Sequence, residues 1–187
     1  MSEVIRVLRR EHANMTSLVK TLEWQIAEFE RGGTPDYDLI RSALDYFLSF
    51  PELYHHPKED MVYARLRERD PEAARRVGDL RREHEALAAR SREFAAGVMA
   101  VIDEAQVPRQ SLVRWGRAFI DLQVAHMCME EEVFFPAALE GLSEADWRSL
   151  EAEMTREEDP LFGEHVGGRF ETLRRSILKW QTEAERG

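Results

Sequence analysis

Apolar residues recur along the chain in steps of three and four over four long stretches. The stretches run over residues 8–29, 44–66, 77–98 and 112–137. Steps of this size keep side chains on one face of an α-helix. Four helices of about 30 residues, each about 45 Å long, joined by short loops, predict an all-α fold, an antiparallel up-down four-helix bundle.

The breaks between the stretches carry residues typical of turns and helix caps. Glycine and proline in residues 32–36 separate the first two helices. Asp70 is expected to be an N-cap with Pro71 at the first helical position, and Pro108 is expected to open the fourth helix in the same way. Pro51 and Pro57 fall inside the second helix, where each removes a backbone donor and is expected to bend it.

Residues 141–187 are expected to form C-terminal helices that pack on the bundle. Ser143 is a predicted N-cap, followed by an acidic first turn, for a short fifth helix. Asp159-Pro160 begins a last segment that is expected to end in a docked helix. The apolar residues of this helix are Phe170, Leu173, Ile177, Leu178 and Trp180. The chain is thus predicted to be a single domain, residues 1–187, with the bundle in residues 1–140.

The sequence also repeats itself. The segment Leu8–His12 recurs identically at Leu80–His84, 72 residues later. Residues 55–59 are echoed by residues 126–130, 71 residues later, with His at the start and Glu at the end of both. A repeat of this length is one helical hairpin used twice, so the two halves are expected to be related by a pseudo-two-fold axis.

Composition narrows the classes of protein. Apolar residues make up 43% and charged residues 33% of the chain, a mixture typical of a folded globular protein. The formal net charge of -10 argues against nucleic acid and against an anionic membrane surface as partners. There is no long apolar run and no signal sequence, and the single cysteine permits no intrachain disulfide. These features predict a cytoplasmic protein without a membrane partner; whether it forms a homodimer is left open.

The candidate chemistry lies on the inward stripes. Each predicted helix carries one inward histidine, and two of these have a glutamate four residues on. A step of four advances a helix by about 400° and about 6 Å, so each histidine and its glutamate project from the same face. The set directed at the interior is His12, His55, Glu59, His84, His126 and Glu130.

Two buried carboxylates without partners would be expensive, and two metal cations remove that cost. A lone core histidine is more often a packing residue, and one His–Glu pair is more often a surface contact. Only the whole set, matched across the repeat and in phase on four helices, favours a metal site. Mixed nitrogen and oxygen ligands suit iron or manganese, whereas structural zinc prefers four ligands that are often thiolates.

This pattern of histidines and glutamates resembles that of the hemerythrin-like, cation-binding (HHE) family over roughly residues 1–140. Residues 159–163, Asp-Pro-Leu-Phe-Gly, also resemble a C-terminal motif of bacterial members. The resemblance implies a four-helix bundle with an oxo- or hydroxo-bridged centre of two iron ions. It implies further that the four histidines are terminal ligands and that Glu59 and Glu130 are bridging ligands.

The sequence departs from the oxygen-carrying hemerythrins in two ways. Those proteins place two histidines one turn apart on the third helix, but here Leu80 stands one turn before His84. The second bridging carboxylate follows its histidine by four residues, not five. Both departures argue against reversible oxygen carriage, and they leave a coordination position open for water, His56 or His165.

The remaining polar residues near the pattern have ordinary interpretations. His56 is expected to point away from the face of His55 and to lie either at the surface or against a ligand from outside. His165 is expected to be an exposed loop residue. Cys128 is expected to be a small buried apolar group. Asp60 and Glu131 are expected to be solvated or to contact a ligand from outside. Glu11 and Glu83 are expected to make surface salt bridges, or else to orient the adjacent histidine, His12 or His84.

Two classes of function follow. The first is a binding or sensing module whose di-iron site binds oxygen, nitric oxide or peroxide, or handles iron itself. The alternative is a di-iron redox enzyme that acts in nitrosative or oxidative stress or in the repair of iron–sulfur clusters. No separate general base, nucleophile or cofactor motif is recognisable, so an enzyme would have to work at the metal ions.

Overall fold

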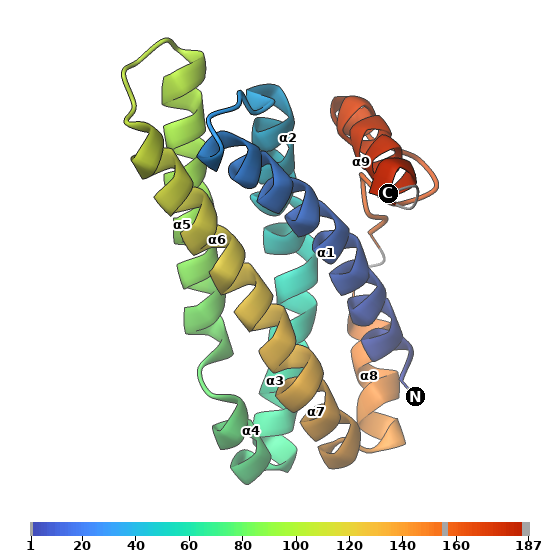
Figure 1. Ribbon diagram of the computed structural model, residues 1–187. Helices are drawn as coiled ribbons and strands as arrows, with labels where there is room; N and C mark the ends of the chain where they lie inside the picture. Colours follow the sequence, from blue (N-terminus) through green and yellow to red (C-terminus); the bar gives the residue numbers. More distant parts are fainter. Residues whose placement is uncertain (1, 155–156, 185–187) are drawn as a thin grey trace.

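The bundle has four long helical segments, two of them continuous and two interrupted (Figure 1). The computed structural model describes residues 2–154 and 157–184, with side chains up to residue 178. The segments are, in order, α1 (Glu3–Glu30); α2 (Tyr37–Phe47) with the π-helical turn η1 (Pro51–His55) and α3 (His56–Arg69); α5 (Leu80–Ile102); and α6 (Arg109–Met129) with the π-helical turn η2 (Glu130–Phe134) and α7 (Phe135–Gly141). The prediction of an all-α, up-down four-helix bundle is confirmed.

The segments form a closed ring around an apolar interior. Helix α6 packs against α1 and α5, and α2 packs against α5 and α1. One apolar cluster surrounds Phe94 and Phe119, and a second surrounds Leu8 and Leu66. Burial of each such side chain contributes about 1.5–3 kcal/mol. On every segment the inward histidine falls between the residues of the two clusters, so the fold presents one polar layer between two apolar ones.

A π-helical turn interrupts the second and the fourth segments close to this polar layer. A π turn fits an extra residue into the helix and changes which side chains face inward. Pro51 begins η1, and Pro57 is the second residue of α3, so the helix is interrupted where the prolines predicted a bend. In the fourth segment Pro136 likewise follows two residues after the end of η2.

The third segment begins later than the pattern predicted. Asp70 is an N-cap as expected and its carboxylate accepts from the backbone of Ala73, but this cap opens a separate helix, α4 (Pro71–Val77). Gly78 then adopts a φ of 94°, and Asp79 caps α5. The stripe over residues 77–98 was therefore wrong at its start, because Val77 belongs to the preceding helix. Pro108 is the N-cap of α6 rather than its first residue.

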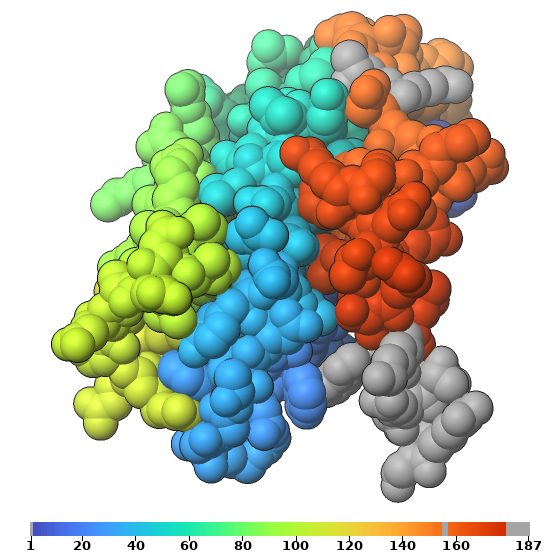
Figure 2. Space-filling view, turned by 90° about the horizontal axis from the view of Figure 1, so that it is seen from above, coloured from blue at the N-terminus to red at the C-terminus, as the bar shows by residue number. Residues whose placement is uncertain are grey.

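The C-terminal segment lies on one side of the bundle. Ser143 and Asp146 form a reciprocal capping box for α8 (Glu144–Glu153), which contacts α1 and α3. After the short helix η3 (Gly168–Phe170), α9 (Glu171–Ala184) contacts α1 and α2, and Figure 2 shows this segment beside α2 and away from α5.

The tail is attached through its apolar residues and through one carboxylate. Phe170, Leu173 and Ile177 are buried in the cluster of Phe94 and Phe119, whereas Leu178 is exposed. The predicted contact of Trp180 lies outside the described side chains. Asp159 accepts from Tyr46 Oη at 2.9 Å and from Asn14 Nδ2 at 3.2 Å, which ties the tail to α1 and α2. None of the helices among the described residues is long and apolar enough to cross a bilayer.

Candidate metal centre

One buried histidine enters the polar layer from each helical segment. His12 lies on α1, His55 at the end of η1, His84 near the start of α5 and His126 near the end of α6. None is more than 6% exposed. The structure thus brings together four side chains that lie up to 114 residues apart in the sequence.

The carboxylates of Glu59 and Glu130 lie between these rings, and both are 0% exposed. Each is close to the histidine one helical turn before it. His55 Nε2 is 3.1 Å from Glu59 Oε1, and His126 Nε2 is 3.1 Å from Glu130 Oε1. Two equivalent His–Glu pairs therefore face each other across the bundle.

The other two histidines lie between the two pairs. His12 Nε2 is 3.3 Å from Glu130 and 3.5 Å from Glu59. His84 Nε2 is 3.4 Å from Glu59 and 3.7 Å from Glu130. All four Nε2 atoms and both carboxylates thus converge on one small volume.

The converging atoms lack hydrogen-bond partners. All four carboxylate oxygens of Glu59 and Glu130 are buried without a hydrogen bond, and so is Nε2 of His12, His84 and His126. Leaving such groups unsatisfied inside a protein is expensive. Metal ions would satisfy imidazole and carboxylate donors together, so the residues present fit a metal site.

The outer nitrogen of each ring faces a second carboxylate. The pairs are His55 Nδ1 with Glu11 at 2.7 Å, His126 Nδ1 with Glu83 at 3.0 Å, His12 Nδ1 with Glu131 at 3.0 Å and His84 Nδ1 with Asp60 at 3.3 Å. At His12, His55 and His126 this contact is a hydrogen bond in which Nδ1 donates, because an ionised carboxylate only accepts, and the Nε2 lone pair is left for the centre. His84 Nδ1 lies near Asp60 without a hydrogen bond. The four carboxylates are two pairs of counterparts in the repeat, Glu11 with Glu83 and Asp60 with Glu131.

Glu11 differs from the surface residue that was expected. It is 4% exposed, and its second oxygen accepts from Lys58 Nζ at 2.6 Å. Glu83 is 39% exposed and orients His126 from the surface. The expectation of surface salt bridges was therefore wrong for Glu11. The alternative was wrong in its partner, because Glu11 orients His55 and Glu83 orients His126, and neither orients the adjacent histidine. The identical pentapeptides were the available signal, because each glutamate orients a histidine on the next helical segment.

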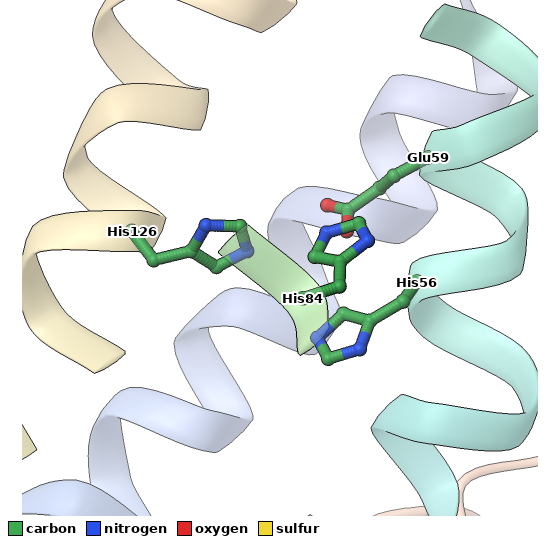
Figure 3. Close-up of side chains that lie close together, drawn as sticks. All are labelled: His56, Glu59, His84 and His126. Atoms are coloured by element: carbon green, nitrogen blue, oxygen red, sulfur yellow. The ribbon is translucent and has the colours of Figure 1, made fainter. Parts of the chain in front are cut away.

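His56 was expected to point away from the face of His55 and to lie either at the surface or against a ligand from outside, and the surface position was wrong. Its ring is 6% exposed and stacks on the ring of His84, with centroids 4.1 Å apart and planes 10° apart. In a continuous α-helix, consecutive side chains point about 100° apart. The π-helical turn η1 ends at His55, and this change in the helix allows both His55 and His56 to face inward. Figure 3 shows His56 beside His84, together with His126 and Glu59.

The positions of three other residues, Cys128, His165 and Leu80, can be compared with those expected from the sequence. Cys128 is exposed and unpaired, so the expectation of a buried apolar group was wrong. His165 is an exposed loop residue, as expected; its side chain is 89% exposed and lies 3.5 Å from Glu158. Leu80 is 0% exposed and belongs to the apolar cluster of Leu8.

The electrostatics of the metal-free centre favour charged histidines. Burial would lower the pKa of His12 and His84, but the carboxylates close to each ring raise the pKa of both to about 11. Burial would also lower the pKa of His126, but Glu130 and Glu83 raise it to about 9. Burial and the charge of Glu59 would raise the pKa of Glu130, yet the surrounding histidines lower it to about 2. In the absence of metal, protons on the rings compensate the buried carboxylates.

A four-helix bundle with buried imidazoles and carboxylates at its centre defines a class of metal-binding helical proteins. A family model, the hemerythrin HHE cation binding domain, matches residues 3–138. This match covers most of the chain, so the chain belongs to that family. No curated protein and no solved structure gives a significant match.

Proposed function

We propose that the chain is a non-haem di-iron protein. The two ions would be bound by His12, His55, Glu59, His84, His126 and Glu130, with an oxo or hydroxo bridge between them. One observation carries the proposal: among the described residues, buried potential ligand atoms form two groups, each within 4.8 Å, and the groups share Glu59. One group is His12, His55, Glu59 and Glu130, and the other is His56, Glu59, His84 and His126. A shared carboxylate between two groups suits a bridging ligand of a two-metal centre.

The donor set supports iron over structural zinc. The two groups contain only imidazole nitrogens and carboxylate oxygens, and they offer more atoms than one tetrahedral ion uses. Iron is stable with such mixed donors and can change its oxidation state. The chain's own residues would hold the ions, fix each ring through Nδ1 and keep bulk water from Glu59 and Glu130.

The function that this centre supports best is to bind or react with oxygen, nitric oxide or peroxide, or to handle iron. The bound iron would supply the redox chemistry. Support comes from the position of the polar layer, which is buried between two apolar clusters. We further propose that residues 1–187 form a single domain of a cytoplasmic protein.

Mixing the reduced, iron-loaded protein with nitric oxide or peroxide under anaerobic conditions tests this function. A binding or sensing module should take up the small molecule once per centre and then stop. Sustained turnover with an electron donor would instead support the alternative, a di-iron redox enzyme. Reduced protein that shows no spectral change with oxygen, nitric oxide or peroxide would contradict both.

A further inference from the structure

The two halves of the centre match closely, but they differ in the number of imidazoles that face it. His12 and His84 correspond, and the pairs of residues 55 and 59 correspond to 126 and 130. The counterpart of His56, 71 residues later, is Met127. The first half thus contributes one more imidazole than the second, which makes the centre unsymmetrical.

The surroundings of the two matched rings show the same difference. His84 is stacked by His56, with ring centroids 4.1 Å apart. His12 is stacked instead by Phe135, with centroids 5.2 Å apart and planes 19° apart. Phenylalanine cannot ligate a metal ion, whereas histidine can. The aromatic neighbour of His12 therefore cannot bind a metal ion, whereas the aromatic neighbour of His84 can.

The orientation of His56 follows the rule seen at the other four histidines. Its Nδ1 lies near a carboxylate, with Glu52 Oε1 at 3.4 Å, and like Nδ1 of His84 it makes no hydrogen bond there. One ring nitrogen lies within 4.8 Å of ligand atoms of Glu59, His84 and His126 (Figure 3). In the other four rings Nδ1 pairs with a carboxylate and Nε2 faces the centre, so Nε2 is the atom of His56 that suits a metal ion.

We propose that His56 is a third imidazole ligand of the iron ion held by His84 and His126, so that the two ions of the centre are unequal. This inference rests on the proposed di-iron function. The ion near His84 then has three nitrogen ligands, and the ion near His12 and His55 has two. The oxygen-carrying hemerythrins have a histidine on the third segment where this chain has Leu80. In this chain His56, on the second segment, would supply that imidazole.

If the two ions have different numbers of imidazole ligands, small molecules are expected to reach the centre from the side of His12. A surface pocket of about 500 Å³ reaches His12 and is lined by Val19, Val124, Met127 and Cys128, among others. A smaller pocket of about 300 Å³ on the opposite side has His56 in its wall, beside His84. With His56 as a further ligand of its ion, the ion near His12 and His55 would have fewer imidazole ligands, and His12 is the residue that the larger and more apolar pocket reaches.

The test compares the full chain, loaded with iron and reduced, with two variants. His56→Met introduces the residue that the second half carries at this position, and Met127→Leu is the matched control. Proton NMR of the paramagnetic protein counts exchangeable, strongly shifted N–H signals, one for each bound imidazole. We expect five in the wild type, five in Met127→Leu and four in His56→Met. His56→Gln serves as a second variant if the methionine disturbs folding, and four signals are expected there too.

A chelator provides an independent readout. Because loss of even an outer partner of a ligand weakens metal binding about 10- to 100-fold, His56→Met should release one of its two ions at least about tenfold faster than the wild type. A wild-type protein with two ions and only four shifted signals would overturn the role of His56 and leave the di-iron function intact. If His56→Met released both ions at the same rate, the role of His56 would likewise be overturned and the di-iron function left intact. A wild type that binds no pair of iron ions would overturn the proposed function itself.

Discussion

Lys58 Nζ lies 2.6 Å from Glu11 Oε1 inside the bundle, where the two side chains are 8% and 5% exposed. The second oxygen of Glu11 accepts from His55 Nδ1 at 2.7 Å. The counterpart of Lys58 in the second half of the repeat is Met129, which carries no charge. A buried chain of lysine, glutamate and histidine thus supports one half of the centre only.

Replacing Lys58 with methionine should destabilise the metal-free protein. The substitution leaves Glu11 buried with one partner fewer, and breaking a buried pair costs about 3–5 kcal/mol. Urea unfolding followed by circular dichroism measures the loss. Arg117→Ala is the control, because its pair with Glu30 is about 38% exposed and such pairs contribute about 0–1 kcal/mol. Equal losses in both variants would contradict the role given to Lys58.

Removal of either central glutamate should abolish binding of the metal pair. Glu59→Ala and Glu130→Ala should behave alike, since the repeat makes the two residues equivalent. Glu131→Ala should retain the pair, because Glu131 contacts Nδ1 of His12 and not the centre; its affinity should fall about 10- to 100-fold. Metal content after gel filtration separates these cases. Loss of metal from Glu131→Ala with retention in Glu130→Ala would show that the two roles are exchanged.

The stability of the metal-free and iron-loaded proteins should respond to pH in opposite directions. The raised pKa values of His12, His84 and His126 stabilise the metal-free fold fully below the unfolded value of 6.5, and this contribution is lost as pH rises through about 9 to 11. The lowered pKa of Glu130 stabilises the fold above 4.5, and this contribution is lost as pH falls through about 2. The metal-free protein should therefore be most stable between about pH 4.5 and 6.5.

Iron binding requires neutral imidazoles, so loading must displace protons from these rings. The stabilisation by iron should then increase between about pH 5.5 and 8. Thermal midpoints of both forms across this range test the pair of trends, and a pH electrode in weakly buffered solution records the protons released on loading. Parallel trends without proton release would mean that the rings are not protonated in the metal-free protein.

Asp159 should be needed for docking of the tail and not for metal binding. Its carboxylate accepts from Tyr46, Asn14 and the backbone of Leu161 and Phe162. Asp159→Ala leaves these donors unsatisfied, at a cost of about 1–3 kcal/mol for a buried group. Limited proteolysis should cleave the variant after the bundle faster than it cleaves Glu157→Ala, while the iron content stays unchanged. Loss of iron from Asp159→Ala would show that the tail helps to form the centre.

The bundle and its polar layer could be predicted because both depend on helical periodicity and on the repeat. The period of 3.6 residues placed His12, His55, His84 and His126 inward, and a spacing of four added Glu59 and Glu130. The start of a helix at Asp70 could also be predicted, since an aspartate followed by proline is a strong signal for a helix N-terminus.

His56, Cys128 and Val77 could not be placed, for physical reasons. The π turn η1 changes the facing of His56, and nothing in the local sequence distinguishes such a turn from a continuous helix with two prolines. Cys128 faces outward although cysteine is among the most often buried residues. The positive φ of Gly78 ends α4 and detaches Val77 from the stripe that followed it.

The central claim is tested most directly by elemental analysis of the protein purified after iron-supplemented expression, with protein concentration from amino-acid analysis. Two iron atoms per chain are expected, because two groups of ligand atoms share one buried glutamate. One tightly held zinc ion per chain, with no iron, would contradict a di-iron centre.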